Sequence, residues 1–256
     1  MPVYVVTGAS RGIGQCICDI LLTKTEPTSI KIIAVARSIS PLQQLQTKYG
    51  SDRVSIIAGD LSEQSTVTEI TQLINDKYDG ELSGIIANAG VLDPVDRIAD
   101  ANITEWVKLF QINFFSIVLL ISSTLPFLRK AHGQVVLVSS GASTKGYYGW
   151  GAYGASKAAL NQFAAQLAAE EADIKVVAVA PGVVDTQMQI DIREKFGSNM
   201  TPESLQRFID LKENNQLVKP EVPATIYANL AVKGIPSDLN GSYLRYNDEK
   251  LASFAI

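Results

Sequence analysis

Short apolar runs alternate with longer stretches of helical periodicity along the 256 residues of the chain. The runs have the length and composition of buried strands, and they lie at residues 3–6, 29–36, 53–58, 82–87, 133–139, 174–180 and 241–246. Strands separated by helices pair in parallel, because the chain needs a crossover helix to return to the same edge of a sheet. The alternation therefore predicts a doubly wound α/β fold, with about seven parallel strands between two layers of helices.

No linker-like, low-complexity or highly charged segment divides the chain, so residues 1–256 are expected to form a single domain. A net charge of −4 does not favour a nucleic-acid partner. The first apolar run begins at Val3, which leaves no room for a signal peptide, and polar residues interrupt the longest apolar run, at residues 112–128. We therefore expect a cytoplasmic protein without a membrane span. Two cysteines, Cys16 and Cys18, and a single histidine do not make up a metal site.

A glycine-rich turn, Thr7-Gly8-Ala9-Ser10-Arg11-Gly12-Ile13-Gly14, separates the first apolar run from an apolar-periodic helix. Gly8 permits a tight turn, Gly12 lets the backbone approach a pyrophosphate, and Gly14 lets the helix pack close to the strand. The start of the helix offers N–H groups to that anion. Strand, turn and helix together indicate a dinucleotide site, with a glycine turn that binds nothing as the alternative. The expected contacts in this turn are Gly8, Ser10, Arg11, Gly12 and Ile13.

Arg37 and Ser38 follow the second apolar run, where folds of this kind meet the adenosine ribose. An acidic residue at this place would select NAD, and the sequence has none at the end of the run. Arg37 and Arg11 suit a 2′-phosphate instead, because guanidinium groups bind phosphate oxygens in pairs and stay charged. The sequence therefore predicts NADP(H), with two ordinary surface arginines as the alternative.

Small and polar residues follow the third and fourth apolar runs as well. Asp60 can accept a hydrogen bond from an adenine amino group, and Leu61 can flank the ring. Asn88, Ala89 and Gly90 form a small turn that suits the close approach of a flat ligand. We expect all five residues to contact the cofactor.

A long helix is predicted from Asn102 to about Lys130, with a kink before Pro126. It carries Asn113 on an otherwise apolar stretch, and a buried amide needs hydrogen-bond partners. Taken alone, this position is equally compatible with a satisfied core amide and with a site residue.

Ser140 follows the fifth apolar run, at the edge of the sheet where ligands bind in open α/β folds. Val138 stands where the nucleophile elbow of a hydrolase has its first glycine. His132 precedes the same run, so it belongs near the opposite end of the sheet. These observations disfavour a Ser-His-Asp hydrolase and leave Ser140 as a hydrogen-bond donor to a substrate oxygen.

Tyr153 and Lys157 lie four residues apart in an alanine-rich stretch, residues 151–172, of high helix propensity. On a helix both side chains rise from one face. An ammonium beside a phenol favours the phenolate, so we expect the pKa of Tyr153 to lie below about 10. Such a phenol is suited to donate a proton to a carbonyl oxygen. For this pair alone, a core tyrosine and a solvated lysine are the alternative.

The segment at residues 186–217 is amphipathic, and its length and flexible Met and Phe side chains favour a lid over the substrate. Two surface helices are the alternative. The candidate substrate contacts are Ser140, Tyr147, Trp150, Tyr153 and Met188. This aromatic, largely uncharged set favours an apolar ketone or vicinal diketone over a small hydroxy acid.

Together these motifs resemble those of the classical short-chain dehydrogenases/reductases, over essentially the whole chain. The glycine turn, Asn88-Ala89-Gly90 and Pro181-Gly182-x-x-x-Thr186 match three family motifs, although Ala87 replaces the first residue of the family's Asn-Asn-Ala-Gly. The family's catalytic tetrad is matched by Asn113, Ser140, Tyr153 and Lys157. Ala36-Arg37-Ser38 and residues 213–217 are similar to the fungal group around benzil reductase, which is related to sepiapterin reductases.

The resemblance implies a Rossmann-type α/β/α fold in three layers. It implies that the cofactor is also held by Tyr153, Lys157, Pro181, Gly182, Val184 and Thr186. Ser140 and Tyr153 would donate hydrogen bonds to the substrate carbonyl, and Tyr153 would deliver the proton. Lys157 would bind the nicotinamide ribose, and Asn113 would hold a water that leads to solvent.

The function predicted from these matches is an NADPH-dependent carbonyl reductase. It would convert an apolar ketone or benzil-like diketone into a hydroxy ketone or secondary alcohol. The alternatives are a sepiapterin-type reductase, an alcohol dehydrogenase and an NADP-binding sensor without turnover. The resemblance also implies a homodimer or homotetramer through the helices that carry Asn113 and Tyr153. Four alanines are small enough for such packing, at Ala164, Ala165, Ala168 and Ala169.

Overall fold

The computed structural model describes residues 1–25 and 29–256. Its centre is a parallel sheet of seven strands in the order β3-β2-β1-β4-β5-β6-β7. The strands are β1 (Val3–Thr7), β2 (Lys31–Ala36), β3 (Val54–Ala58), β4 (Gly84–Ala87), β5 (Gln134–Val138), β6 (Lys175–Ala180) and β7 (Tyr243–Arg245). Each strand lies at one of the predicted apolar runs, which confirms the predicted doubly wound fold.

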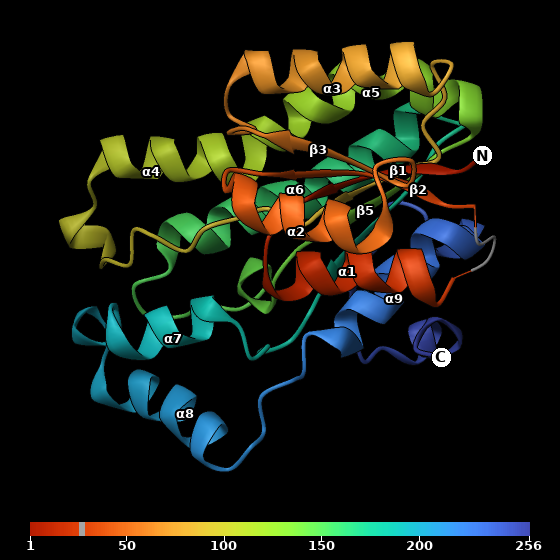
Figure 1. Ribbon diagram of the computed structural model, residues 1–256. Helices are drawn as coiled ribbons and strands as arrows, with labels where there is room; N and C mark the ends of the chain where they lie inside the picture. Colours follow the sequence, from red (N-terminus) through yellow and green to blue (C-terminus); the bar gives the residue numbers. More distant parts are fainter. Residues whose placement is uncertain (26–28) are drawn as a thin grey trace.

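Helices cover both faces of the sheet (Figure 1). One face carries α1 (Gly12–Thr23), α2 (Ile39–Tyr49) and α9 (Glu221–Lys233), and the other carries α3 (Gln64–Lys77), α5 (Ser116–Ala131) and α6 (Gly151–Glu170). Successive strand residues point to opposite faces. In β1, Tyr4 and Val6 join the first core, whereas Val3 and Val5 join the second. Because both faces are covered, the strands are apolar along their whole length.

All seven strands end at the same edge of the sheet, because they are parallel. The segments that follow the strands gather there, among them α4 (Ile103–Phe110) and the 3₁₀ turns Ile98–Asp100 and Gly141–Ser143. Helices α7 (Gln187–Glu194) and α8 (Pro202–Glu213) lie beyond this edge in Figure 1 and occupy the predicted lid segment. Further 3₁₀ turns lie at Gly197–Asn199, Ser237–Leu239 and Glu249–Phe254. The helices α7 and α8 are called the lid below.

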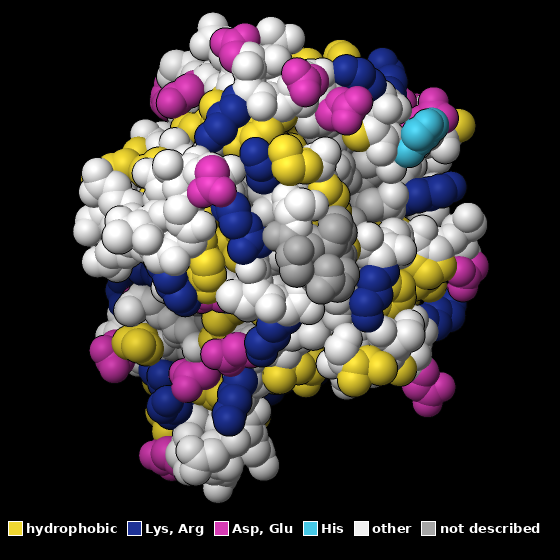
Figure 2. All heavy atoms as spheres, turned by 45° about the vertical axis from the view of Figure 1, so that its right-hand side comes forward, with side chains coloured by type: hydrophobic (Ala, Val, Ile, Leu, Met, Phe, Trp, Pro, Cys, Tyr) yellow, Lys and Arg dark blue, Asp and Glu magenta, His cyan; other side chains and the backbone are white. Residues whose placement is uncertain are grey.

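The single histidine lies at the other edge of the sheet. His132 ends α5 and precedes β5, and its side chain is 75% exposed. Figure 2 shows it on the surface, on a face where positive and negative side chains are intermixed. Ser140 follows the far end of β5, about 17 Å along the strand. The separation agrees with the prediction that these two residues do not form a hydrolase triad.

Pro126 does not end the long helix. Pro126 lies inside α5, which continues to Ala131. Both Pro126 and Ser122, whose carbonyl loses its helical donor, are exposed, so water can bind that carbonyl. The long helix is irregular at Asn113, where the π-helical turn Gln111–Phe115 separates α4 from α5. Turns of this kind insert an extra residue and re-aim a side chain.

Among the described residues, one helical run is long and apolar enough to cross a membrane by length and composition alone, Ile103–Ala131. Core helices of globular proteins pass the same test. This run packs one side on the sheet, where Ile117, Leu120 and Leu128 are buried. Its outer side leaves large apolar side chains exposed, at Ile103, Val107 and Phe115.

Two of the four alanines expected to face a partner face their own chain instead. Ala164 is buried in the core beneath α6. Ala168 packs against the loop before β7, where a Cβ on Gly241 would lie 2.9 Å from the Ala168 Cβ. Ala165 and Ala169 remain exposed. Helical periodicity could not distinguish the alanines that face their own chain from the exposed ones, because residues 151–172 are alanine-rich on every side of the helix.

Candidate active site

The glycine turn and the end of β4 are joined by hydrogen bonds. The Thr7 hydroxyl accepts from the backbone N–H groups of Asn88 and Ala89, both at 3.0 Å. The Asn88 side-chain amide donates to the Thr7 carbonyl at 3.0 Å. A Cβ on Gly14 would collide with the Gly8 carbonyl oxygen, so α1 can start this close to β1 only with glycine at that position. The structure thus brings the first two predicted motifs together.

The start of α1 fits the phosphates of a dinucleotide. Its first residue is Gly12, with a φ of +55°, and the capping position, Arg11, makes no side-chain hydrogen bond to the first turn. The first N–H groups of the helix therefore lack a side-chain cap and are suited to an anion. A Cβ on Gly12 would lie 3.3 Å from the Thr186 methyl group, so the Pro181–Thr186 turn faces the glycine turn. Gly182 in that turn has a φ of +81°.

Arg37 and Asp60 lie close together at the ends of β2 and β3. The backbone and side chain of Ser62 donate to Asp60 Oδ1, at 2.9 and 2.7 Å. Burial opposes ionisation of this carboxyl, but the Ser62 hydrogen bonds and the positive charge of Arg37 outweigh it and hold its pKa below the usual value. Arg11, Arg37 and Ser38 are exposed, and Leu61 is buried. The predicted adenosine contacts therefore share one end of the crevice.

Tyr153 and Lys157 rise from the buried face of α6, as their spacing predicts. Their residues are 7% and 3% exposed. The Lys157 ammonium lies 5.8 Å from the centroid of the Tyr153 ring and donates to the Val138 carbonyl at 2.8 Å. The Ser140 side chain, two residues after Val138, lies near the phenol and acts to lower its pKa. The end of β5 thus contacts both of these side chains of α6.

The pKa of Tyr153 shifts in the opposite direction to the one predicted. Burial raises it, and the nearby Ser140 side chain counteracts this without cancelling it. Burial also lowers the pKa of Lys157 from 10.5 to about 8. The sequence showed the spacing of the pair but not how deeply it is buried. Burial disfavours the charged phenolate and sets the direction of the shift.

Asn113 is a fully satisfied buried amide beside Lys157. Its Oδ1 accepts from the Val91 N–H, and its Nδ2 donates to the Val91 carbonyl, both at 2.8 Å. Nδ2 also lies 3.2 Å from Ser156 Oγ on α6. A Cβ on Gly90 would lie 3.3 Å from Asn113 Oδ1 and 3.4 Å from Lys157 Nζ. Gly90 therefore leaves room for a ligand or a water where these two side chains meet.

Ser140 is held by residues that sequence reasoning did not identify. Its carbonyl accepts from the Ser143 hydroxyl at 2.6 Å and from the Tyr243 hydroxyl of β7 at 3.2 Å. The Asn161 side chain on α6 links Ser143 to Ser139, at 2.8 and 2.6 Å. The Ser140 hydroxyl accepts from the Ala142 N–H at 3.1 Å, which leaves its own proton free to donate. No local pattern signals this network, because it joins three distant segments.

Apart from Ser140, the predicted substrate residues belong to a third apolar cluster, under the lid. Trp150 and Tyr153 are buried in it together with Phe196 and Phe208 of the lid segment, and Tyr147 and Met188 pack against it half-buried. Arg245, at the end of β7, was not singled out from the sequence. Its Nη1 would lie 3.2 Å from a Cβ on Gly141, next to Ser140.

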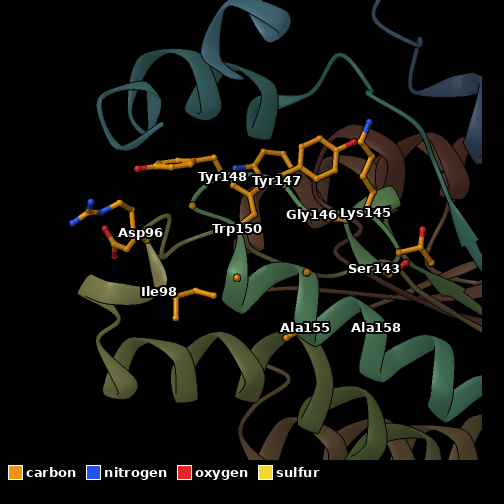
Figure 3. A pocket seen from close by; sticks show the side chains of 16 residues that line it. Asp96, Ile98, Ser143, Lys145, Gly146, Tyr147, Tyr148, Trp150, Ala155 and Ala158 are labelled. Carbon is orange, nitrogen blue, oxygen red and sulfur yellow. The ribbon is translucent and has the colours of Figure 1, made fainter. Parts of the chain in front are cut away.

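A cavity of about 600 Å³ lies beside this cluster. Figure 3 shows Tyr147, Tyr148 and Trp150 along one side of it, with Ala155 and Ala158 of α6 opposite. Neither Ser140 nor Tyr153 lines this cavity. Since Tyr153 and Ala155 lie on different sides of α6, the cavity adjoins Tyr153 rather than covering it.

The profile of the short chain dehydrogenase family matches residues 2–197. The chain belongs to this family. Short-chain dehydrogenases are oxidoreductases that bind a nicotinamide cofactor in a Rossmann-type fold, and the strand order and converging motifs described above are those of such a fold.

Its relatives within the short-chain dehydrogenases include yeast oxidoreductases. It is 51% identical to the oxidoreductase YIR035C of Saccharomyces cerevisiae over 98% of each chain. The crystal structure of that protein matches with a TM-score of 0.96 over 100% of both chains. The chain is also 49% identical, over 97% of each chain, to benzil reductase ((S)-benzoin forming) IRC24 of the same yeast. A further crystal structure, of a cytoplasmic protein of S. cerevisiae, is 46% identical and matches with a TM-score of 0.84 over 100% of both chains.

Proposed function

We propose that the protein is an NADPH-dependent carbonyl reductase that acts on apolar ketones and vicinal diketones of the benzil type. The product is a hydroxy ketone or a secondary alcohol. The observation that carries the proposal is the buried Tyr153 phenol, beside Ser140 and close to Lys157, at the edge of the sheet where the glycine turn also opens. The similarity to a benzil reductase over nearly the whole chain supports it.

The protein's part in the reaction is to hold the carbonyl and protonate its oxygen. The Ser140 hydroxyl and the Tyr153 phenol donate hydrogen bonds to that oxygen, as an oxyanion hole does. The raised pKa of Tyr153 keeps the phenol protonated at neutral pH, so a proton is available as the oxygen gains negative charge. When bound, the nicotinamide supplies the hydride.

The remaining two members of the tetrad act on Tyr153. Lys157 places a positive charge beneath the phenol and binds the hydroxyls of the nicotinamide ribose. Asn113 fixes the π-helical turn against Val91. In the space that Gly90 leaves, Asn113 also holds a water between Lys157 and solvent. Val184 and Thr186 hold the carboxamide.

The choice of NADPH rests on Arg11 and Arg37. Both are exposed at the adenosine end of the crevice, and the charge of Arg37 already acts on Asp60. Two guanidinium groups favour a 2′-phosphate, whereas an acidic residue at the end of β2 would favour NAD. The remaining phosphate contacts come from Gly8, Ser10, Gly12, Ile13 and Ser38. The remaining adenosine contacts come from Asp60, Leu61, Asn88 and Ala89.

The preference for apolar substrates rests on the aromatic cluster under the lid, which includes Trp150 and Phe208. A sepiapterin-type reductase and an alcohol dehydrogenase share this machinery and remain alternatives. A non-catalytic NADP sensor is disfavoured by the intact tetrad. We also propose that the protein works in the cytoplasm, as the similarity to a cytoplasmic yeast protein supports.

Steady-state kinetics of the wild-type protein test the proposal. NADPH oxidation is measured with benzil, with aryl ketones, with a pterin-type carbonyl and with an α-keto acid, and each is repeated with NADH. We expect the highest kcat/KM with a vicinal diketone and NADPH. Equal efficiency with NADH would remove the two-arginine argument, and absence of turnover with every carbonyl would favour the sensor.

A further inference from the structure

Trp150 stacks against aromatic rings from two different segments. Its ring lies 4.9 Å from the Tyr147 ring at an interplanar angle of 22°, and 5.5 Å from the Phe208 ring at 18°. Tyr147 belongs to the loop after β5, whereas Phe208 belongs to α8 in the lid. The indole is 8% exposed, so much of the surface that the sequence assigned to substrate is covered by protein.

The same indole also meets the catalytic tyrosine. The Trp150 and Tyr153 rings are 5.8 Å apart and perpendicular, at 89°. Edge-to-face contacts of this kind are favourable and fix the relative orientation of two rings. Trp150 is thus in contact with the lid on one hand and with the proton donor on the other. Arg207 of α8 lies over two of the same rings, 5.4 Å from Tyr147 and 5.7 Å from Phe208.

The backbone of Trp150 is fixed, whereas its indole nitrogen is not satisfied. The Trp150 carbonyl accepts from the Gly154 N–H at 2.8 Å, and its own N–H donates to the Tyr147 carbonyl at 3.2 Å. Gly149 has a φ of +79° and accepts from the Asp96 N–H at 3.0 Å. The Trp150 Nε1, however, is buried without a hydrogen-bond partner. A buried unpaired N–H is costly, and withdrawal of the lid would let water reach it.

We propose that Trp150 is a positioning residue that couples closure of the lid to the alignment of Tyr153. This inference rests on the proposed reductase function. With the lid closed, Phe208 holds the indole, and the indole braces the Tyr153 ring next to Ser140. With the lid open, the indole loses Phe208, its N–H is hydrated, and the brace on Tyr153 is released. Ring stacking stabilises the closed state, and the unpaired N–H destabilises it. Because the two effects oppose each other, neither the open nor the closed state is strongly favoured.

Three variants and one control test the coupling. Trp150→Leu removes the ring, Trp150→Phe keeps a ring but lacks the N–H, and Phe208→Leu removes the contact from the lid side. Trp106→Phe is the control, since Trp106 is the second tryptophan and contacts α6 at Gly151 outside the stack. We expect Trp150→Leu and Phe208→Leu to lower kcat about tenfold to a hundredfold with unchanged NADPH affinity, and Trp150→Phe to recover most of the rate.

Two readouts do not depend on turnover. In the Trp106→Phe protein, Trp150 is the sole tryptophan, so its emission should shift when NADPH and a diketone are added. Trypsin should cut the lid, which carries Arg193, Arg207 and Lys212, faster in Trp150→Leu than in the wild type. A wild type without reductase activity would refute the proposed function, and these two readouts would then still decide the coupling.

The coupling is overturned if Trp150→Leu reduces carbonyls at the wild-type rate while only its melting temperature falls, because Trp150 would then be a packing residue. The coupling would also be overturned by equal rates of trypsin cleavage in Trp150→Leu and the wild type, together with a Trp150 emission that does not change when NADPH and the diketone are added.

Discussion

Lys157 combines a charge with deep burial. The residue is 3% exposed, and its ammonium donates to the Val138 carbonyl at 2.8 Å. Desolvation disfavours the charged form and lowers the pKa from 10.5 to about 8. The neighbouring phenol shifts in the opposite sense, because burial raises the pKa of Tyr153. As pH rises, the lysine therefore loses its proton before the tyrosine does.

We predict that carbonyl reduction falls as pH passes through about 8, where Lys157 becomes neutral. A neutral amine neither favours the ribose contact nor returns a proton to Tyr153, which is itself still protonated in this range. The measurement is kcat for reduction between pH 6 and pH 10, with NADPH saturating throughout. A profile that stays flat to pH 9.5 would contradict the assignment.

Stability provides an independent check on the same group. Its folded pKa lies below its unfolded value, so between about 8 and 10.5 the unfolded chain binds more protons. This lysine's contribution to the unfolding free energy therefore rises with pH in that window. Lys157→Met should remove that rise in urea titrations.

At the scale of elements, the irregular turn at Asn113 joins the long helix to the end of β4. The Asn113 amide satisfies both backbone groups of Val91, each at 2.8 Å, in a position that is fully buried. The turn therefore does two things: it places Val91 and Gly90 beside Lys157, and it closes the gap between two segments of the site.

Asn113→Ala is predicted to cost about 2–4 kcal/mol of unfolding free energy, because two buried backbone groups lose their partners. Urea unfolding measures the loss. The matched control is Asn75→Ala, whose amide lies exposed on α3 and bonds to its neighbour Asp76. A loss no larger than the control's would show that water replaces the amide at Val91.

The strands were predictable from the sequence, whereas several details of the site were not. Strands covered on both faces are continuous apolar runs, and this signal is local. The fixed spacings of Ser140, Tyr153 and Lys157 are local as well. The burial that raises the pKa of Tyr153 is not a local property of the sequence. The support that Tyr243 and Asn161 give to Ser140 is not local either, since those contacts span up to 103 residues.

At the scale of the molecule, the outer side of the long helix is apolar and exposed. Ile103, Val107 and Phe115 are 68%, 55% and 50% exposed, on the run Ile103–Ala131. Exposed apolar side chains on a helix that carries a site residue favour an interface. We propose that a second copy of the chain covers this side, giving the homodimer or homotetramer that the resemblance implies.

Phe115→Glu is predicted to convert the assembly into monomers, because association would bury a charge against apolar side chains. Light scattering at micromolar concentration measures the mass. Val222→Glu, which places the same charge on α9 on the other face of the sheet, should leave the mass unchanged. A wild-type protein that is already monomeric would refute the interface.

The central claim is that Tyr153 donates the proton in carbonyl reduction. Tyr153→Phe removes the hydroxyl and keeps the ring that packs against Trp150. The direct measurement is single-turnover NADPH oxidation with benzil, alongside NADPH binding by fluorescence in the same preparation. We predict unchanged NADPH affinity with turnover at least about 10² to 10³ slower than wild type. Turnover within tenfold of wild type, at equal NADPH affinity, would contradict the claim.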